Sequence, residues 1–243
     1  MATWWTGPSQ RRLFSSVEIR DRNYERWTSG VVLSESKARL LEYIRSLWYC
    51  PDSSYKMRHL PAEFGKYLPA LHNLHSLTLS DIRVEHIGEE GFRTCFSAFR
   101  GSLTYLYLDA FVTSFSAFVA LVDYFPNITT LELDSFVLRP DKGPVPPQSR
   151  PFRGKIHLHA QAHFLEFFDR FAKLDLEYEE LVIDTPLFIF KETEFVESAL
   201  RVGASTVKFL RLTAELECEY PSPAPFIETA SLPTPLTFKP KIQ

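Results

Sequence analysis

The sequence predicts an α/β protein, built as an open array of repeats with parallel strands on one face and helices on the other. Three observations lead to this fold class. A short apolar-x-apolar phrase recurs along the chain, it recurs at a nearly constant interval, and helix-like segments separate its copies. The 243 residues, of which 45% are hydrophobic and 23% charged, are enough to bury a core of that size.

The recurring phrase is clearest within residues 101–136, where "LTYLYLD" is followed 25 residues later by "ITTLELD". Alternation of apolar and polar residues over a few positions predicts a strand with one buried face. A period of 20–29 residues with this phrase is typical of leucine-rich repeats, so we expect an open leucine-rich-repeat-like solenoid with concave strands and convex helices. Eight apolar pairs recur at intervals of 25 to 30 residues: Val17/Ile19, Leu47/Tyr49, Leu77/Leu79, Leu106/Leu108, Leu131/Leu133, Ile156/Leu158, Leu181/Ile183 and Leu210/Leu212.

Helical spacing of apolar residues appears between the phrases. Phenylalanines recur at this spacing from Phe115 to Phe125, and Pro126 then stops the helix just before the next strand. Residues 164–174 have the same pattern, and a third helix is expected after Ser34. Because a helix follows each strand in constant order, the strands should be parallel with right-handed crossovers.

Composition divides the chain into three regions. Residues 1–12 form a short leader, and residues 13–219 form the repeat domain of about eight repeats. Within it, residues 139–154 are rich in proline and are expected to be an exposed insertion, because proline cannot pair in a central strand. Residues 220–243 form a proline-rich C-terminal tail.

Charge and cysteine content exclude several classes of function. A net charge of -3 argues against nucleic acid or an acidic membrane as a partner. Three well-separated cysteines fit free thiols in a reducing compartment. No secretory signal and no apolar run long enough to span a membrane is visible, so we expect a cytoplasmic or nuclear protein.

Motifs that carry chemistry are scarce. The sequence has no GxSxG, HExxH, CxxC or glycine-rich phosphate loop, so we expect no catalytic residues, no cofactor and no enzymatic activity. Three histidines, His157, His159 and His163, are of a type that can bind zinc. No cysteine or carboxylate adjacent in sequence completes the set, so we interpret them as exposed polar residues and expect no metal.

The face of the strands opposite the apolar pairs is the better candidate for a binding surface. The alternation places Trp48 and Ser80 on this face, together with aromatic and acidic residues near the middle of the array. Such a surface would favour a protein partner with a basic segment. The candidate partner-binding residues are Tyr105, Tyr107, Asp109, Glu132, Asp134, His157, His159 and Asp184.

Three stretches, "RRLFSSVEIRDRNYERW", "LLEYIRSLWYC" and "LPALHNLHSLTLSDIRV", resemble the fungal F-box proteins with irregular leucine-rich repeats. The resemblance covers roughly residues 11–215 and implies the substrate-recognition part of a ubiquitin-ligase receptor. In that family an F-box precedes the position of Arg11, where this chain has only "MATWWTGPSQ". Binding to the adaptor of a cullin-RING ligase is therefore expected only if an F-box is restored upstream. The alternatives are a stand-alone leucine-rich-repeat interaction protein with no ubiquitin link and, far behind, a metal-dependent enzyme.

One position departs from the usual leucine-rich repeat. The asparagine often found three positions after the strand is replaced here by Ile82, Phe111 and Phe136. We therefore expect apolar packing at the turns instead of a ladder of asparagines.

Overall fold

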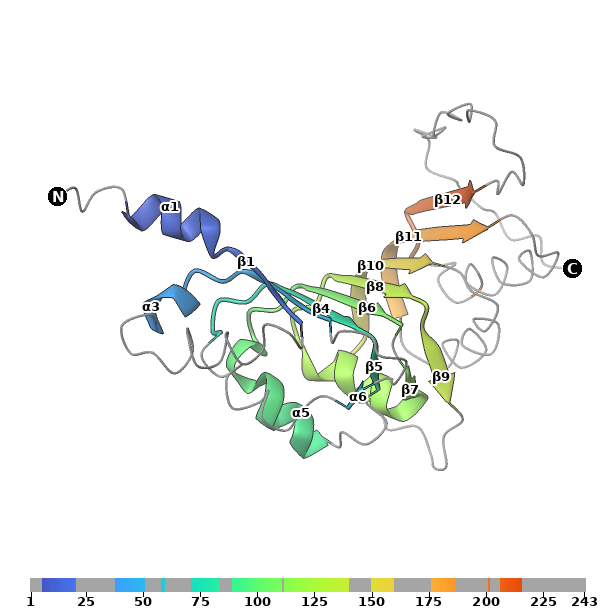
Figure 1. The fold of residues 1–243 in the computed structure, drawn as a ribbon. Helices are drawn as coiled ribbons and strands as arrows, with labels where there is room; N and C mark the ends of the chain where they lie inside the picture. The colour runs from blue at the N-terminus through green and yellow to red at the C-terminus, as the bar shows by residue number, and fades with distance from the viewer. Residues whose placement is uncertain are drawn as a thin grey trace, which may run out of the picture.

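The structure, a computed structural model, describes residues 6–20, 38–50, 58–59, 71–83, 89–110, 112–139, 150–159, 176–186, 201 and 206–215. Within these residues, eight parallel strands form one sheet in which every strand lies beside the next main strand of the chain (Figure 1). The predicted α/β class and parallel strands are confirmed. The strands are β1 (Ser16–Ile19), β2 (Ser46–Tyr49), β4 (Ser76–Ser80), β6 (Tyr105–Asp109), β8 (Thr130–Asp134), β10 (Phe152–His159), β11 (Leu176–Pro186) and β12 (Phe209–Glu215).

The register of the sheet stacks the eight predicted apolar pairs on one face. Leu77 lies opposite Leu106, which lies opposite Leu131, which lies opposite Ile156, and the same row extends to both edge strands. These four side chains are at most 2% exposed. The core of the protein therefore begins on this face, because alternate residues of a strand point to the same side.

Helical segments lie on the core side of the sheet. Figure 1 shows α5 (Glu89–Phe96) and α6 (Phe115–Tyr124) on the same side, with the 3-10 helix η4 (Ser97–Phe99) following α5. The rings of Phe96, Phe99 and Phe125 pack with centroids 5.7 to 6.0 Å apart. These large rings fill the space between the helices and the leucine row.

The helix predicted from Phe115 is confirmed as α6, and local signals fix both of its ends. Ser114 is the N-cap, and its hydroxyl accepts a hydrogen bond from the backbone N–H of Ala117. Phe125 is the C-cap and precedes Pro126, which cannot continue a helix. The described helices before β4 are α1 (Thr6–Leu13) and the single turn α3 (Ala38–Leu41).

A second, four-stranded parallel sheet, which the sequence did not predict, follows the C-terminal ends of the main strands. It contains β3 (Arg58–His59), β5 (Ile82–Arg83), β7 (Val112–Ser114) and β9 (Val137–Arg139), in that order. In three successive repeats the residue directly after the main strand is in the left-handed conformation: Asp81, Ala110 and Ser135, with φ between 45° and 55°. This residue turns the chain out of the main sheet in the same way each time.

Apolar packing at these turns is confirmed at two of its three positions. Ile82 and Phe136 are buried, and Phe136 packs edge-on against Phe118 with ring centroids 5.1 Å apart. Phe111 lies outside the described residues.

At the N-terminal ends of β6 and β8, one backbone carbonyl accepts hydrogen bonds from two consecutive N–H groups, an arrangement here called a forked carbonyl. The His75 carbonyl accepts from the N–H groups of Thr104 and Tyr105 at 2.9 and 3.0 Å. The Thr104 carbonyl accepts from the corresponding pair, Thr129 and Thr130, at 2.8 and 3.0 Å. Strands β6 and β8 are thus each anchored to one carbonyl, that of the residue just before the preceding main strand.

Gly154 occupies the equivalent place in β10, beside a register shift between Gly154 and Lys155. Its φ of +144° favours glycine, and a Cβ built there would lie 2.1 Å from the Thr129 carbonyl oxygen. That same oxygen accepts the Lys155 N–H at 2.8 Å. The close approach of the two backbones therefore requires glycine.

Two of the regions predicted from composition, the leader and the proline-rich insertion, include residues that the structure describes. Helix α1 occupies much of the predicted leader at residues 1–12. At the predicted insertion, residues 139–154, Arg139 ends β9 and Phe152–Gly154 already belong to β10, so strand pairing extends into both ends of the proline-rich stretch. The predicted helix at 164–174 and the tail at 220–243 lie outside the described residues. Of the helix predicted after Ser34, the structure describes the last turn, α3, as helical, and residues 34–37 lie outside the described residues. None of the described helices is both long and apolar enough to cross a membrane.

Candidate functional site

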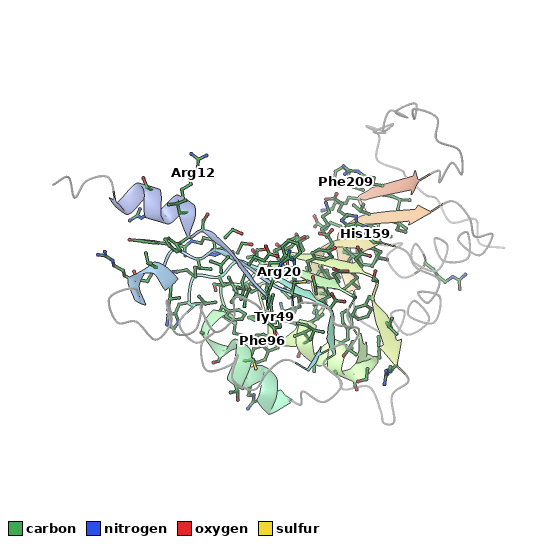
Figure 2. The ribbon with its side chains drawn as sticks, in the orientation of Figure 1. Arg12, Arg20, Tyr49, Phe96, His159 and Phe209 are labelled. Atoms are coloured by element: carbon green, nitrogen blue, oxygen red, sulfur yellow. The ribbon has the colours of Figure 1, made fainter. Side chains whose placement is uncertain are left out.

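Polar side chains occupy the face of the main sheet opposite the leucine row, here called the open face. Figure 2 shows His159 on this side of the sheet and Phe96 on the other. The register arranges the open face in three rows across β4, β6, β8 and β10. The rows are Ser76–Tyr105–Thr130–Lys155, Thr78–Tyr107–Glu132–His157 and Ser80–Asp109–Asp134. Seven of the eight predicted partner-binding residues come together here, all of them half-buried.

Two tyrosines of β6 bind two carboxylates of β8 in the same diagonal way. The Tyr105 hydroxyl donates to Oε2 of Glu132, and the Tyr107 hydroxyl donates to Oδ2 of Asp134 at 3.3 Å. Desolvation and the adjacent carboxylates raise the pKa of both hydroxyls above the usual range. Both tyrosines therefore remain neutral hydrogen-bond donors, held in place by the next strand.

Glu132 also accepts contacts from two histidines of β10. Its Oε1 atom lies 3.2 Å from Nδ1 of His157 and 3.0 Å from Nε2 of His159. The two imidazole rings lie side by side, with centroids 4.2 Å apart. Hydrogen bonds from His157, and then from Tyr105 and His159, lower the pKa of Glu132 to about 2 against the opposing effect of burial. Glu132 is therefore ionised at any physiological pH.

A second polar group lies towards β2. Nε1 of Trp48 donates to the Ser80 hydroxyl at 3.1 Å, and Ser80 in turn hydrogen-bonds Asp109. Burial and the neighbouring Asp134 raise the pKa of Asp109. The Trp48 ring remains 42% exposed, so the group offers an aromatic surface beside a carboxylate.

The open face changes character at β11. Lys155 pairs with Glu180, with Nζ and Oε1 3.1 Å apart, and Val182 lies opposite His157. Val182 is only 2% exposed, so this open-face position is apolar and buried where the sequence pattern favours a polar one. Asp184 pairs in register with His159 through the backbone. Its side chain, like His163, lies outside what the structure describes.

The sequence analysis did not predict that Glu132 lies beside His157 and His159. The histidines were interpreted as lacking a carboxylate nearby, yet the structure brings Glu132 against His157 and His159 from the neighbouring strand. The signal that finds it is the repeat register: Glu132 and His157 are 25 residues apart, one repeat, and they fall opposite each other. The three residues present one ligand atom each, and these atoms lie within 4.8 Å of one another.

The site contains both hydrogen-bond donors and acceptors, and its acidic side chains outnumber its basic ones. Asp109, Glu132 and Asp134 contribute three carboxylates at its centre, and Lys155 is already paired with Glu180. Such a surface can hold a cationic group between carboxylates and stack a side chain on an aromatic ring. Comparison with known proteins finds no matching protein family, no matching curated protein and no matching solved structure.

Proposed function

We propose that the chain is a protein-binding repeat scaffold, an open leucine-rich-repeat-like solenoid whose open face binds a basic segment of a partner. The observation that carries this proposal is the pairing of Tyr105 with Glu132 and of Tyr107 with Asp134, which repeats the same diagonal contact twice between β6 and β8. Side chains already held in one conformation lose little entropy when a partner binds them. Aromatic residues next to carboxylates are also the type of anchor that contributes most to interfaces.

The solenoid part of the proposal rests on regularity along the chain. The eight main strands are parallel, follow the order of the sequence and keep their apolar pairs aligned across intervals of 25 to 30 residues. This is the arrangement expected when successive repeats stack on their neighbours.

The role within the cell follows from the resemblance described above. We infer a function like that of the substrate-recognition part of an F-box ubiquitin-ligase receptor, with no catalytic residues of its own. The alternative is a stand-alone interaction protein with no ubiquitin link. The genomic sequence upstream of the Met1 codon separates the two: an encoded F-box, together with coprecipitation of the cullin-RING adaptor by the longer chain, supports the receptor.

Affinity capture tests the binding face. Wild type should enrich a protein with a basic segment, and added salt should weaken this capture. Tyr105→Ala combined with Tyr107→Ala should lose it. Tyr124→Ala is the matched control, because Tyr124 is a half-buried tyrosine on α6 and not on the open face of the sheet. Circular dichroism verifies that each variant is folded. If the double variant captures the same proteins as wild type, the open face is not the binding surface.

A further inference from the structure

We propose that Glu132, His157 and His159 bind one divalent transition-metal ion of the zinc class. The three residues lie on two adjacent strands of the main sheet, β8 and β10. His157 and His159 are two positions apart on β10 and therefore point to the same face. Glu132 lies directly opposite His157 in the register. Strand pairing thus places all three side chains, without any contribution from a loop.

Their separations suit a single ion. Two ligand atoms that each lie about 2.0–2.1 Å from a tetrahedral zinc ion are about 3.3 Å from one another. Oε1 of Glu132 lies 3.2 Å from Nδ1 of His157 and 3.0 Å from Nε2 of His159. One ligand atom from each of the three residues lies within 4.8 Å of the other two. Small rotations of the side chains bring them to equal distances from an ion.

The ligand types select the metal. Two imidazole nitrogens and one carboxylate oxygen are a donor set that zinc accepts, whereas calcium and magnesium prefer oxygen atoms alone. The three side chains are between 18% and 30% exposed, so water can reach the ion and fill a fourth position. This arrangement is that of an open site with three protein ligands, not of a closed structural site.

Tyr105 prepares the carboxylate for this role. Its hydroxyl donates to Oε2 of Glu132, which leaves Oε1 directed at the two histidines. Groups that hold a metal ligand in this way typically change metal affinity by about 10- to 100-fold when removed. The competing interpretation is a hydrogen-bonded network in which each imidazole donates N–H to Oε1, and the following measurements separate the two.

The first experiment uses the untagged full chain, stripped with a chelator, and zinc sulfate alone as the ligand. Isothermal titration calorimetry should show one equivalent bound, and zinc should raise the melting temperature of the wild-type protein. Cobalt(II) bound in place of zinc should give the intense visible absorption of a four-coordinate ion. Neither readout depends on the partner, so failure here leaves the proposed binding function untouched.

Variants assign the site. Glu132→Gln and His157→Asn should each weaken zinc binding by at least about 100-fold, and Tyr105→Phe should weaken it by about tenfold. His75→Asn is the matched control, since His75 is an exposed histidine at the start of β4, outside the cluster, and should bind zinc as wild type does. If a variant has a much lower melting temperature than wild type, the zinc stoichiometry and the cobalt spectrum of the wild-type protein still test the proposal.

Two results would overturn the proposal. One is the absence of saturable zinc uptake by the wild-type chain. The other is equal uptake by wild type and by the Glu132 and His157 variants, which would assign the zinc to other groups such as the cysteine thiols.

Discussion

The two faces of the same strands differ in chemistry although their residues alternate one by one. In β6 and β8, Leu106 and Leu131 are at most 2% exposed and contact other apolar side chains of the core. Their chain neighbours Tyr107 and Glu132 are half-buried and hydrogen-bonded across the strands. The comparison teaches that the leucine face contributes stability, whereas the open face contributes specific contacts. Substitutions on the leucine face should therefore change stability, and substitutions on the open face should change binding.

The largest effect should come from a change that disturbs both faces at once. Gly154→Ala adds a Cβ 2.1 Å from the Thr129 carbonyl oxygen, at a φ that alanine rarely adopts. The unfavourable φ and the displaced backbone together should cost about 2–6 kcal/mol of unfolding free energy. Chemical denaturation measures this loss. Because β10 would shift against β8, zinc uptake should fall with stability.

Gly101→Ala is the control for Gly154→Ala, because a Cβ at Gly101 meets no atom within 4 Å. It should change the unfolding free energy by no more than about 1 kcal/mol. A Gly154→Ala protein as stable as wild type would show that the two strands approach less closely than described.

The next effect breaks the leucine face alone. Leu106→Ala removes a fully buried side chain from the middle of the core and should lower the unfolding free energy by about 2–5 kcal/mol. In contrast to Gly154→Ala, it should leave zinc affinity at low temperature within a fewfold of wild type. Loss of zinc binding in a folded Leu106→Ala protein would contradict the separation of the two faces.

The smallest effect, and the only gain, is expected on the open face. Burial and Asp134 raise the pKa of Asp109 above its usual value of 3.8, so ionising Asp109 costs more in the folded than in the unfolded protein. Wild type therefore loses stability as pH rises from the usual pKa through the raised one, and the loss persists at neutral pH. Asp109→Asn keeps a hydrogen-bond partner for Ser80 and removes this penalty. Its melting temperature should exceed that of wild type by up to about 3 °C at neutral pH.

At pH values well below 3.8 the two proteins should melt together, because both then carry a neutral side chain at position 109 in the folded and the unfolded state. A constant difference between them at every pH would mean that lost packing or hydrogen bonding, not ionisation, separates them.

The sequence was sufficient to predict the strands of the main sheet. Period-two alternation depends on local chemistry, and a fixed interval between phrases brings residues such as Leu77 and Leu106 to the same place in neighbouring strands. Helix α6 was predictable for the same reason, since Ser114 and Pro126 mark its ends within the local sequence.

Features that depend on contacts between repeats were not read from the sequence. The left-handed turn residues Asp81, Ala110 and Ser135 share no residue type, so no motif marks the second sheet that follows them. Glu132 was predictable as a residue of the binding face but not as a partner of the histidines, because it comes near His157 only through strand pairing and not along the chain. Searching one repeat length away finds it.

The forked carbonyls at the strand starts have a consequence for how such a chain can change over evolutionary time. The carbonyls of His75 and Thr104 each fix the first residue of the next main strand and the residue before it. The alignment of these adjacent strands therefore does not depend on how many residues lie between them. Intervals of 30, 29 and 25 residues follow one another from β2 to β8, and the pairing of these strands has no shift in register. Insertions and deletions between strands can therefore accumulate while the pattern of side chains on the open face stays intact. A lineage can lengthen or shorten a repeat, or exchange one open-face residue, as two independent changes.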